Sequence, residues 1–420
     1  MLKRLSIIIF SLVILSACDK EDENIPEINA NFTASKITIF EGEFVTFTDQ
    51  STNNPTSWEW DFGSSNINSS TEQNPTVVFE ESGIYNISLT ASNENSSDRE
   101  VKSEFITVVK SVKASFETSD SIIDQGNEIT FTDTSVGSPN SWEWNFEGAS
   151  PASSTESNPV VKYNTPGIYE ATLKVTTDQE PEGNISTKEI IVLPTNGLIA
   201  YYPFDGDAED YSGNEFHGFL NNGVSAFNDR NQQSGKAYKF DGEDDHIVTS
   251  PEIDENLSNG ASFAAWIYIS EVGSTARILS NYNGTGVEGA CNERIGFVFG
   301  ITEDQRLNIF YATDGNKYDG RITEATSLEA NKWYHVVGTW NGNYSPSGFN
   351  LYINGTQRDV SNLDSGFSNC GTYLESTNPF HIGIGECATG PCAPFNGAID
   401  EVRIYDRTLS PEEINALSKS

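Results

Sequence analysis

One short stretch near the middle of the chain could bind a hard cation. It offers four side-chain oxygens within a single loop, those of Asp205, Asp207, Asp210 and Asn214. Carboxylate and amide oxygens are the ligands that calcium prefers. The spacing is not that of an EF-hand, because Gly is missing at the sixth position counted from Asp205 and Phe216 occupies the twelfth. The stretch therefore predicts a calcium site of another type, with a solvated acidic turn as the alternative.

The cysteines predict disulfide bonds in the last third of the chain. Four of the five lie there, namely Cys291, Cys370, Cys387 and Cys392. An even number in an exported protein indicates disulfides, and three pairings are open. We favour Cys387–Cys392 across a short loop and Cys291–Cys370 between two longer loops. A zinc site is the alternative, but the sequence has no CxxC pair and no His at ligand spacing.

The N-terminus indicates export. Lys3 and Arg4 precede an apolar run over residues 5–17, which is too short to span a bilayer and is typical of a signal peptide. The run ends in Leu-Ser-Ala-Cys, which resembles the lipobox of bacterial lipoproteins. This resemblance implies cleavage before Cys18 and lipidation of its sulfur, with a second chain on the freed amine. An ordinary secretory signal with a chance Cys is the alternative.

The residues after Cys18 bear on the final location. Asp19 to Asn24 read DKEDEN, which resembles the export signal of surface-exposed lipoproteins in some Gram-negative bacteria. A solvated acidic linker would look the same. We expect a signal peptide at 1–17 and an acidic tether at 18–27. The protein would then be lipid-anchored in the outer membrane and face the cell exterior.

The net charge of the chain limits the kinds of partner that it is expected to bind. The formal net charge of −37 is spread along the chain and would repel nucleic acid and anionic lipid surfaces. We therefore expect no nucleic-acid partner, and contact with the membrane through the lipid anchor only. Abundant Thr, Ser, Asn, Gly, Tyr and Phe favour strands and turns.

A repeat occupies the first half of the chain. The peptide SWEWDFG at 57–63 returns as SWEWNFEG at 141–148. Trp58 and Trp142 differ by 84 positions (142 − 58), and the same offset relates other matching residues on either side of the pair. Solenoid repeats are shorter, roughly 20–50 residues, so the offset predicts two tandem domains. Short alternating stretches between turn residues predict a small immunoglobulin-like β-sandwich for each.

The repeated tryptophans are interpreted as core. Trp58, Trp60 and Phe62 fall on one face of a strand, because side chains alternate with period two. We expect Trp60 and Trp144 to be buried, and Trp58 and Trp142 somewhat less so. The motif resembles the W-D-F-G-D-G signature of PKD domains, closely in the first copy and loosely in the second. The resemblance implies PKD-like domains at 28–110 and 111–193, and it suggests that they act as a stalk.

A larger domain follows at 196–420. Six segments occur in order along it: GLIAYYPFDGDAEDYSGNEFHG, KAYKFDGEDDHI, SFAAWIYIS, KWYHVVGTW, FNLYINGTQ and FNGAIDEVRIYDRTLSPEEI. Together they resemble the concanavalin A-like, laminin-G-like jelly-roll domain. The chain as a whole is thus expected to be all-β, with two immunoglobulin-like sandwiches before a larger jelly roll. Helix signals occur only at Ser410-Pro411-Glu412-Glu413, which predict an N-cap, a Pro at the first position and early acids.

The jelly-roll resemblance also places the metal. In related domains the D-x-S-G-N piece and the Asp of the I-D-E-V-R-I-Y strand come together around calcium. Carried over residue by residue, this implies a structural calcium held by Asp210, Asn214 and Asp400.

Catalysis is not expected. Some glycoside hydrolases that share the sandwich carry two Glu on one strand as E-x-D-x-x-E. The nearest match here is Glu252-Ile253-Asp254, and Leu257 stands in the place of the second Glu. The four His are dispersed, and His335, in a strand, is interpreted as a satisfied structural residue. The sequence has no G-x-S-x-G elbow. We predict that the protein is not an enzyme.

Sugar binding requires flat aromatic faces and planar polar groups. Trp266, Trp333 and Trp340 lie in motif strands and are expected in the core. The remaining candidates lie in loops or at strand ends and are Tyr282, Arg294, Tyr311, Tyr318 and Tyr373. Disulfides would stiffen the same loops and lower the ordering cost of binding.

The sequence thus predicts a surface lipoprotein that binds a polysaccharide or oligosaccharide through its jelly roll, alongside outer-membrane glycan-uptake proteins. A neutral β-glucan is the expected ligand, because the acidic charge disfavours sulfated or uronic chains. An adhesin or assembly protein that binds a protein partner is the first alternative. A glycoside hydrolase with an unrecognised site is the second.

Overall fold

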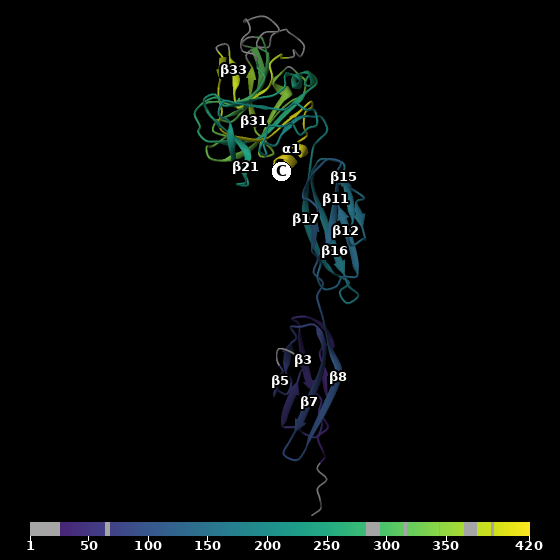
Figure 1. Ribbon diagram of the computed structural model, residues 1–420. Coiled ribbons are helices and arrows are strands. Elements are labelled where there is room, and N and C mark those ends of the chain that lie inside the picture. Colours follow the sequence, from purple (N-terminus) through teal and green to yellow (C-terminus); the bar gives the residue numbers. More distant parts are fainter. Residues whose placement is uncertain are drawn as a thin grey trace, which may run out of the picture. The chain divides into compact units, whose positions relative to one another are not determined.

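The computed structural model describes residues 26–63, 68–282, 295–314, 317–343, 345–364, 376–387 and 390–420. The predicted all-β class is confirmed, since regular structure within these ranges is almost entirely strand (Figure 1). The exceptions there are the helix α1 (Pro411–Leu417) and the short 3-10 helices η1 (Pro251–Asn256) and η2 (Pro346–Gly348). No helix in the described part is both long and apolar enough to cross a membrane.

The first repeat forms a sandwich of two sheets. One sheet has the order β1-β3-β6 and the other β2-β8-β7-β4-β5. The strands are β1 (Phe32–Ala34), β2 (Thr38–Phe40), β3 (Phe44–Asp49), β4 (Ser57–Asp61), β5 (Ser69–Ser70), β6 (Thr76–Val78), β7 (Gly83–Ser92) and β8 (Ser97–Val109). Buried and exposed residues alternate along β3 as the period-two pattern requires.

The second repeat has the same plan. Its sheets have the orders β13-β15-β11-β9 and β10-β17-β16-β12-β14. The strands are β9 (Phe116–Thr118), β10 (Ile122–Asp124), β11 (Glu128–Asp133), β12 (Ser141–Phe146), β13 (Ala149–Ser150), β14 (Ser153–Ser154), β15 (Val160–Tyr163), β16 (Gly167–Thr176) and β17 (Asn184–Leu193). Each WEW peptide therefore lies on a strand in the larger sheet, which explains why the two copies share one pattern.

The C-terminal jelly roll packs two sheets against each other. The first, which we call the β23 sheet, contains β20 (Ser225–Asn228), β21 (Ser234–Asp241), β35 (Asn396–Tyr405), β23 (Ala261–Ile269), β28 (Trp333–Trp340), β29 (Phe349–Ile353) and β30 (Thr356–Gln357), and β18 (Leu198–Tyr202) pairs with β35. The second, the β25 sheet, contains β19 (Phe219–Asn221), β22 (His246–Val248), β32 (His381–Ile382), β24 (Ala276–Ser280), β25 (Gly296–Ile301), β26 (Leu307–Asp314), β27 (Lys317–Thr323) and β31 (Asp359–Asp364). A hairpin of β33 (Gly385–Cys387) and β34 (Gly390–Cys392) completes the domain.

The β23 sheet is covered on both faces. Its inner face, with Phe263 and Val336, belongs to the core between the sheets. On its outer face, Ala264 and Val337 pack with Leu417 of α1. The helix begins as predicted, because the Ser410 side chain and Glu413 form a capping box and Pro411 stands at the first position.

Two tryptophans that were expected in the core lie instead on the outer face of the β23 sheet. Trp340 is fully buried between the sheets as expected, but Trp266 and Trp333 are half-buried on the opposite side of their strands. Trp266 lies beside His335, with 5.4 Å between ring centroids. His335 is buried as expected, yet it is not satisfied, because its Nδ1 has no hydrogen-bond partner among the described residues.

Candidate functional site

Two of the predicted ligand-binding residues, Tyr282 and Tyr318, line one pocket on the outer face of the β25 sheet. We call it the tyrosine pocket. Its lining comes from β24, β26, β27 and the β33–β34 hairpin and consists of Arg277, Ser280, Tyr282, Phe310, Ala312, Tyr318, Gly385, Glu386, Cys387 and Cys392. Segments more than one hundred positions apart in the sequence thus meet at this surface.

The aromatic wall of the pocket follows from strand alternation. Along β26, Ile309 and Tyr311 point into the core, so Phe310 and Ala312 point outward. The Phe310 and Tyr318 rings lie 4.8 Å apart between centroids at an interplanar angle of 39°. Gly320 stands opposite Phe310 on β27, and a Cβ there would lie 2.5 Å from the Phe310 Cβ. The missing side chain at Gly320 therefore allows the two strands to carry this ring pair.

Arg277 on β24 supplies the positive charge of the pocket. It is half-buried, and its guanidinium carbon lies 5.9 Å from the Phe310 ring centroid. Burial lowers the pKa of Arg277 to about 10, so the side chain remains charged at neutral pH. Its stem runs past Gly385, where a Cβ would lie 3.0 Å from the Arg277 Cγ. Packing against the hairpin thus fixes the direction of the guanidinium.

The hairpin wall is covalently closed. The predicted bond between Cys387 and Cys392 is confirmed, and it joins β33 to β34. Glu386, on β33, also lines the pocket, and its carboxylate accepts a hydrogen bond of 2.8 Å from Asn378 Nδ2. The other predicted pair, Cys291 and Cys370, lies outside the described residues. The described disulfide restrains one side of the pocket.

The other three residues predicted to bind the ligand, Tyr311, Arg294 and Tyr373, do not line the tyrosine pocket as it is described. Tyr311 was expected near a strand end at the surface, and this prediction is wrong, because its side chain is 1% exposed. Its ring stacks on Trp340 in the core, with 5.8 Å between centroids. Arg294 and Tyr373 lie outside the described residues. Sequence reasoning missed Arg277 and Phe310, although alternation along LNIFYATD would have separated Phe310 from Tyr311 once one buried position was known.

The residues of the predicted calcium site have separate partners. Asp210 accepts through Oδ1 from the Tyr201 and Ser212 amides, at 2.9 Å each, and through Oδ2 from the Ser212 hydroxyl and the Phe216 amide. Asn214 donates from Nδ2 to the Ile199 carbonyl. Both oxygens of Asp210 thus accept hydrogen bonds from donors in this loop and on β18.

Asp400 is occupied elsewhere. It is 2% exposed on β35, and its Oδ2 lies 3.3 Å from Arg230 Nη1 while its Oδ1 accepts from the Glu401 amide. Burial raises the pKa of Asp400 to about 8. Because Asp210, Asn214 and Asp400 each bind separate partners, their arrangement does not fit a shared calcium ion, and we do not propose one.

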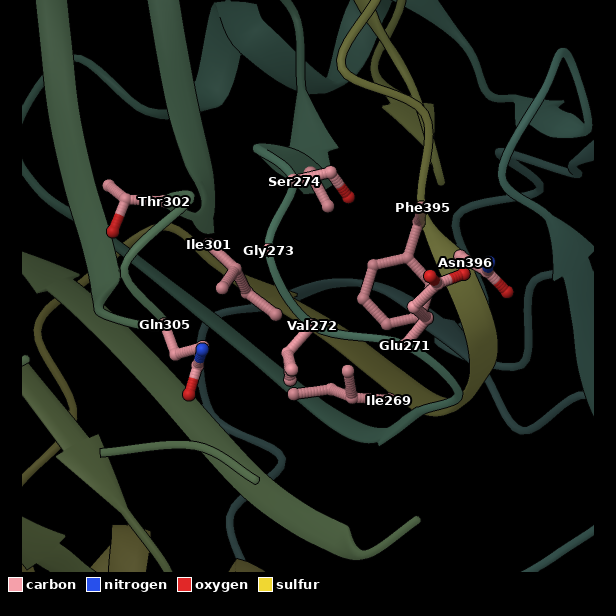
Figure 2. Close-up of a pocket in the computed structure, with 11 residues that line it drawn as sticks. Ile269, Glu271, Val272, Gly273, Ser274, Ile301, Thr302, Gln305, Phe395 and Asn396 are labelled. Atoms are coloured by element: carbon pink, nitrogen blue, oxygen red, sulfur yellow. The ribbon is translucent and has the colours of Figure 1, made fainter. Parts of the chain in front are cut away.

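An acidic cluster and a second pocket of the jelly roll are weaker candidates for a binding site. Asp241, Asp244 and Asp245 place carboxylate oxygens within 4.8 Å of one another, but the buried Asp245 already accepts from the Gly223 and Asp241 amides. Figure 2 shows a second pocket at one end of the sandwich, with the Phe395 ring facing aliphatic side chains that include Ile269 and Ile301. Its described lining residues include neither an aromatic pair nor a cation, unlike those of the tyrosine pocket.

In the near match Glu252-Ile253-Asp254 to the glycosidase motif, Glu252 is exposed and Asp254 has a structural role. Asp254 is fully buried in η1 and accepts from Asn281 Nδ2 at 2.5 Å and from the Ser376 amide at 2.6 Å. The carboxylate therefore ties η1 to the end of β24 and to the segment before β32.

Comparison with protein families identifies the domains. The model for PKD domains matches residues 24–108 and 113–192, and the model for the concanavalin A-like lectin/glucanases superfamily matches residues 241–415. No curated protein matches the chain.

The solved structures that resemble this chain share little sequence identity with it. The binding domain of Paraclostridial Mosquitocidal Protein 1 shares 17% identity at a TM-score of 0.39, over 53% of this chain and 52% of that one. The botulinum neurotoxin serotype C1 binding domain shares 19% identity at a TM-score of 0.39, with the same coverage. The chain thus spans about half the length of these structures.

Proposed function

We propose that this chain, which has two PKD domains and a C-terminal concanavalin A-like domain, binds a saccharide in the tyrosine pocket without hydrolysing it. The observation that carries the proposal is the meeting of Tyr282, Phe310 and Tyr318 beside a charged Arg277. Aromatic rings cover the apolar faces of pyranose rings, and a few fixed polar groups orient the hydroxyls. The PKD domains would act as a stalk.

Preorganisation supports binding at this place. The disulfide closes the hairpin wall, and Phe310 and Tyr318 are held on adjacent strands. Groups that are fixed before the ligand arrives lose little conformational entropy on binding. The pocket can therefore gain affinity from few contacts.

The acid content of the pocket supports binding over catalysis. Glycosidases that act through two carboxylates place them on either side of the scissile bond. Of the described residues that line the tyrosine pocket, Glu386 is the one carboxylate. A single carboxylate can orient a hydroxyl, but it does not complete this mechanism.

Tyr318→Ala is expected to weaken glycan binding at least about fivefold, because one aromatic stack contributes about 1 kcal/mol beyond its buried area. Isothermal titration of the full chain with the best ligand from an oligosaccharide panel measures the change. Tyr211→Ala is the matched control, since Tyr211 is 58% exposed and lies outside the pocket. Unchanged affinity in Tyr318→Ala would show that the ligand binds elsewhere.

We also propose that the protein is anchored in the outer membrane through Cys18 and faces the cell exterior. Radiolabelled palmitate should enter the wild-type protein and be absent from Cys18→Ala, because the sulfur carries the diacylglycerol. Protease added to intact cells should remove the protein. Labelling of Cys18→Ala would refute the anchor, and protection of the labelled wild type would refute surface exposure alone.

A protein partner is the second candidate function. It is favoured by β19, an edge strand of the β25 sheet, where Phe219 is 69% and Leu220 is 44% exposed. Edge strands with exposed apolar side chains can pair with another chain. Phe219→Lys would abolish such binding and leave glycan affinity unchanged.

A further inference from the structure

Arg277 differs from the other arginines of the jelly roll that the structure describes as buried or half-buried, because it has no acidic partner. Within the described ranges its side chain forms no ion pair and no hydrogen bond, and its contact is with the Phe310 ring. The other described arginines of this domain that are not exposed each lie within 3.3 Å of an acidic side chain, and they are Arg230, Arg306, Arg321, Arg403 and Arg407. In a chain with 61 acidic and 24 basic residues, an unpaired arginine is unexpected.

The absence of an acidic partner among the described residues leaves the desolvation of the Arg277 guanidinium without compensation. A half-buried guanidinium has lost part of its hydration, and that loss is normally offset by a paired anion. Arg277 cannot easily turn back to solvent, because its stem packs over Gly385 and beside Phe310. The site therefore presents a fixed cation that lacks a counter-charge from the described part of the protein.

We propose that the tyrosine pocket selects an acidic saccharide, whose carboxylate pairs with Arg277 while its ring stacks on Phe310 and Tyr318. This inference rests on the proposed function and names the class of its ligand. A guanidinium binds a carboxylate through two parallel N–H···O bonds, which adds orientation to charge. Glu386 also lines the pocket, so the ligand's carboxylate lies on the Arg277 side and a hydroxyl faces Glu386.

This preference is opposite to the neutral β-glucan that the net charge of −37 predicts. Exposed charges are screened over about 8 Å at physiological ionic strength. A carboxylate inside the pocket contacts Arg277 directly, and this interaction is much less screened. The local cation therefore outweighs the distant surface acids in the choice of ligand.

The test compares pairs of tetrasaccharides whose members differ only at C6, which carries a hydroxyl in one member and a carboxylate in the other. Neutral gluco-, galacto- and manno-configured tetramers are compared with the same tetramers oxidised to carboxylates at C6, by titration of the full chain. We expect one acidic member to bind at least about tenfold more tightly than its neutral counterpart. Raising the salt concentration should reduce this ratio, since the preference is electrostatic.

Variants of Arg277 assign the preference to this residue. Arg277→Gln should bring the acidic-to-neutral ratio close to one, whereas Arg277→Lys should keep part of the ratio. Arg358→Gln, at an exposed arginine outside the pocket, is the control. The wild-type ratio needs no variant, so it decides the question even if Arg277→Gln does not fold.

The outcomes separate the inference from the proposed function. Equal or tighter binding of the neutral members would overturn the acidic preference and leave saccharide binding standing. A preference that survives Arg277→Gln would also overturn it. If none of the six tetramers binds, the proposed function itself is refuted for hexose glycans, together with the inference.

Discussion

Trp60→Ala and Trp144→Ala should each destabilise their own PKD domain by about 3–5 kcal/mol, the usual effect of emptying a large buried aromatic site. Trp60 is 0% and Trp144 1% exposed. Each ring contacts a Phe at 5.1 Å between centroids, Phe32 in the first domain and Phe116 in the second. Each indole also donates from Nε1 to a carbonyl, that of Glu72 or Glu156, so truncation removes a hydrogen bond as well as packing.

Calorimetry of the full chain measures the effect as a lowered midpoint for one transition. Trp58→Ala and Trp142→Ala are the matched controls. Both indoles are half-buried and donate to half-buried carboxylates, those of Asp49 and Asp133, at 2.7 and 2.8 Å. Their loss should cost clearly less. Equal losses for Trp58 and Trp60 would contradict the distinction between core and rim.

His335→Gln should remove an acid-dependent loss of stability from the jelly roll. Burial lowers the pKa of His335 to about 3, and the nearby Arg403 and Arg230 contribute. The ordinary pKa of about 6.5 applies after unfolding, so the unfolded chain takes up a proton that the folded chain refuses. Stability from this residue is complete above pH 6.5 and falls as the pH drops towards 3, by at most about 4–5 kcal/mol.

Asp400, on the same face, has the opposite sign. Because burial raises its pKa to about 8, folding is favoured when the residue is protonated, and its contribution falls as the pH rises from about 4 to 8. The comparison of His335→Gln with the wild type at each pH isolates the histidine. His217→Gln, at a half-exposed histidine, is the control. Parallel pH profiles for wild type and His335→Gln would contradict the prediction.

Much of the fold could be read from sequence because its signals are local. The WEW repeat marks two copies of one strand, and period-two alternation indicates that Trp60 and Phe62 share a buried face. The capping box at Ser410 and Glu413 needs only neighbouring residues. Cys387 and Cys392 are close enough along the chain that their hairpin brings them together. Each of these features is decided within a short segment.

Tertiary structure alone decided which face of a strand becomes a site. In β23 and β28 nearly every residue is buried, because α1 and the side chains packed with it cover part of the face opposite the core. Alternation cannot mark the inner side of such strands, and Trp266 and Trp333 were therefore placed wrongly.

The binding site depended on packing in the same way. Tyr311 and Phe310 are adjacent, and only the pairing of the two sheets puts the first in the core and the second in the pocket. The stem of Arg277 packs over Gly385, more than one hundred positions away, and its guanidinium forms no ion pair in the described structure. Sequence determined the strands and their capping, since these depend on neighbours along the chain. The pocket depends on neighbours in space.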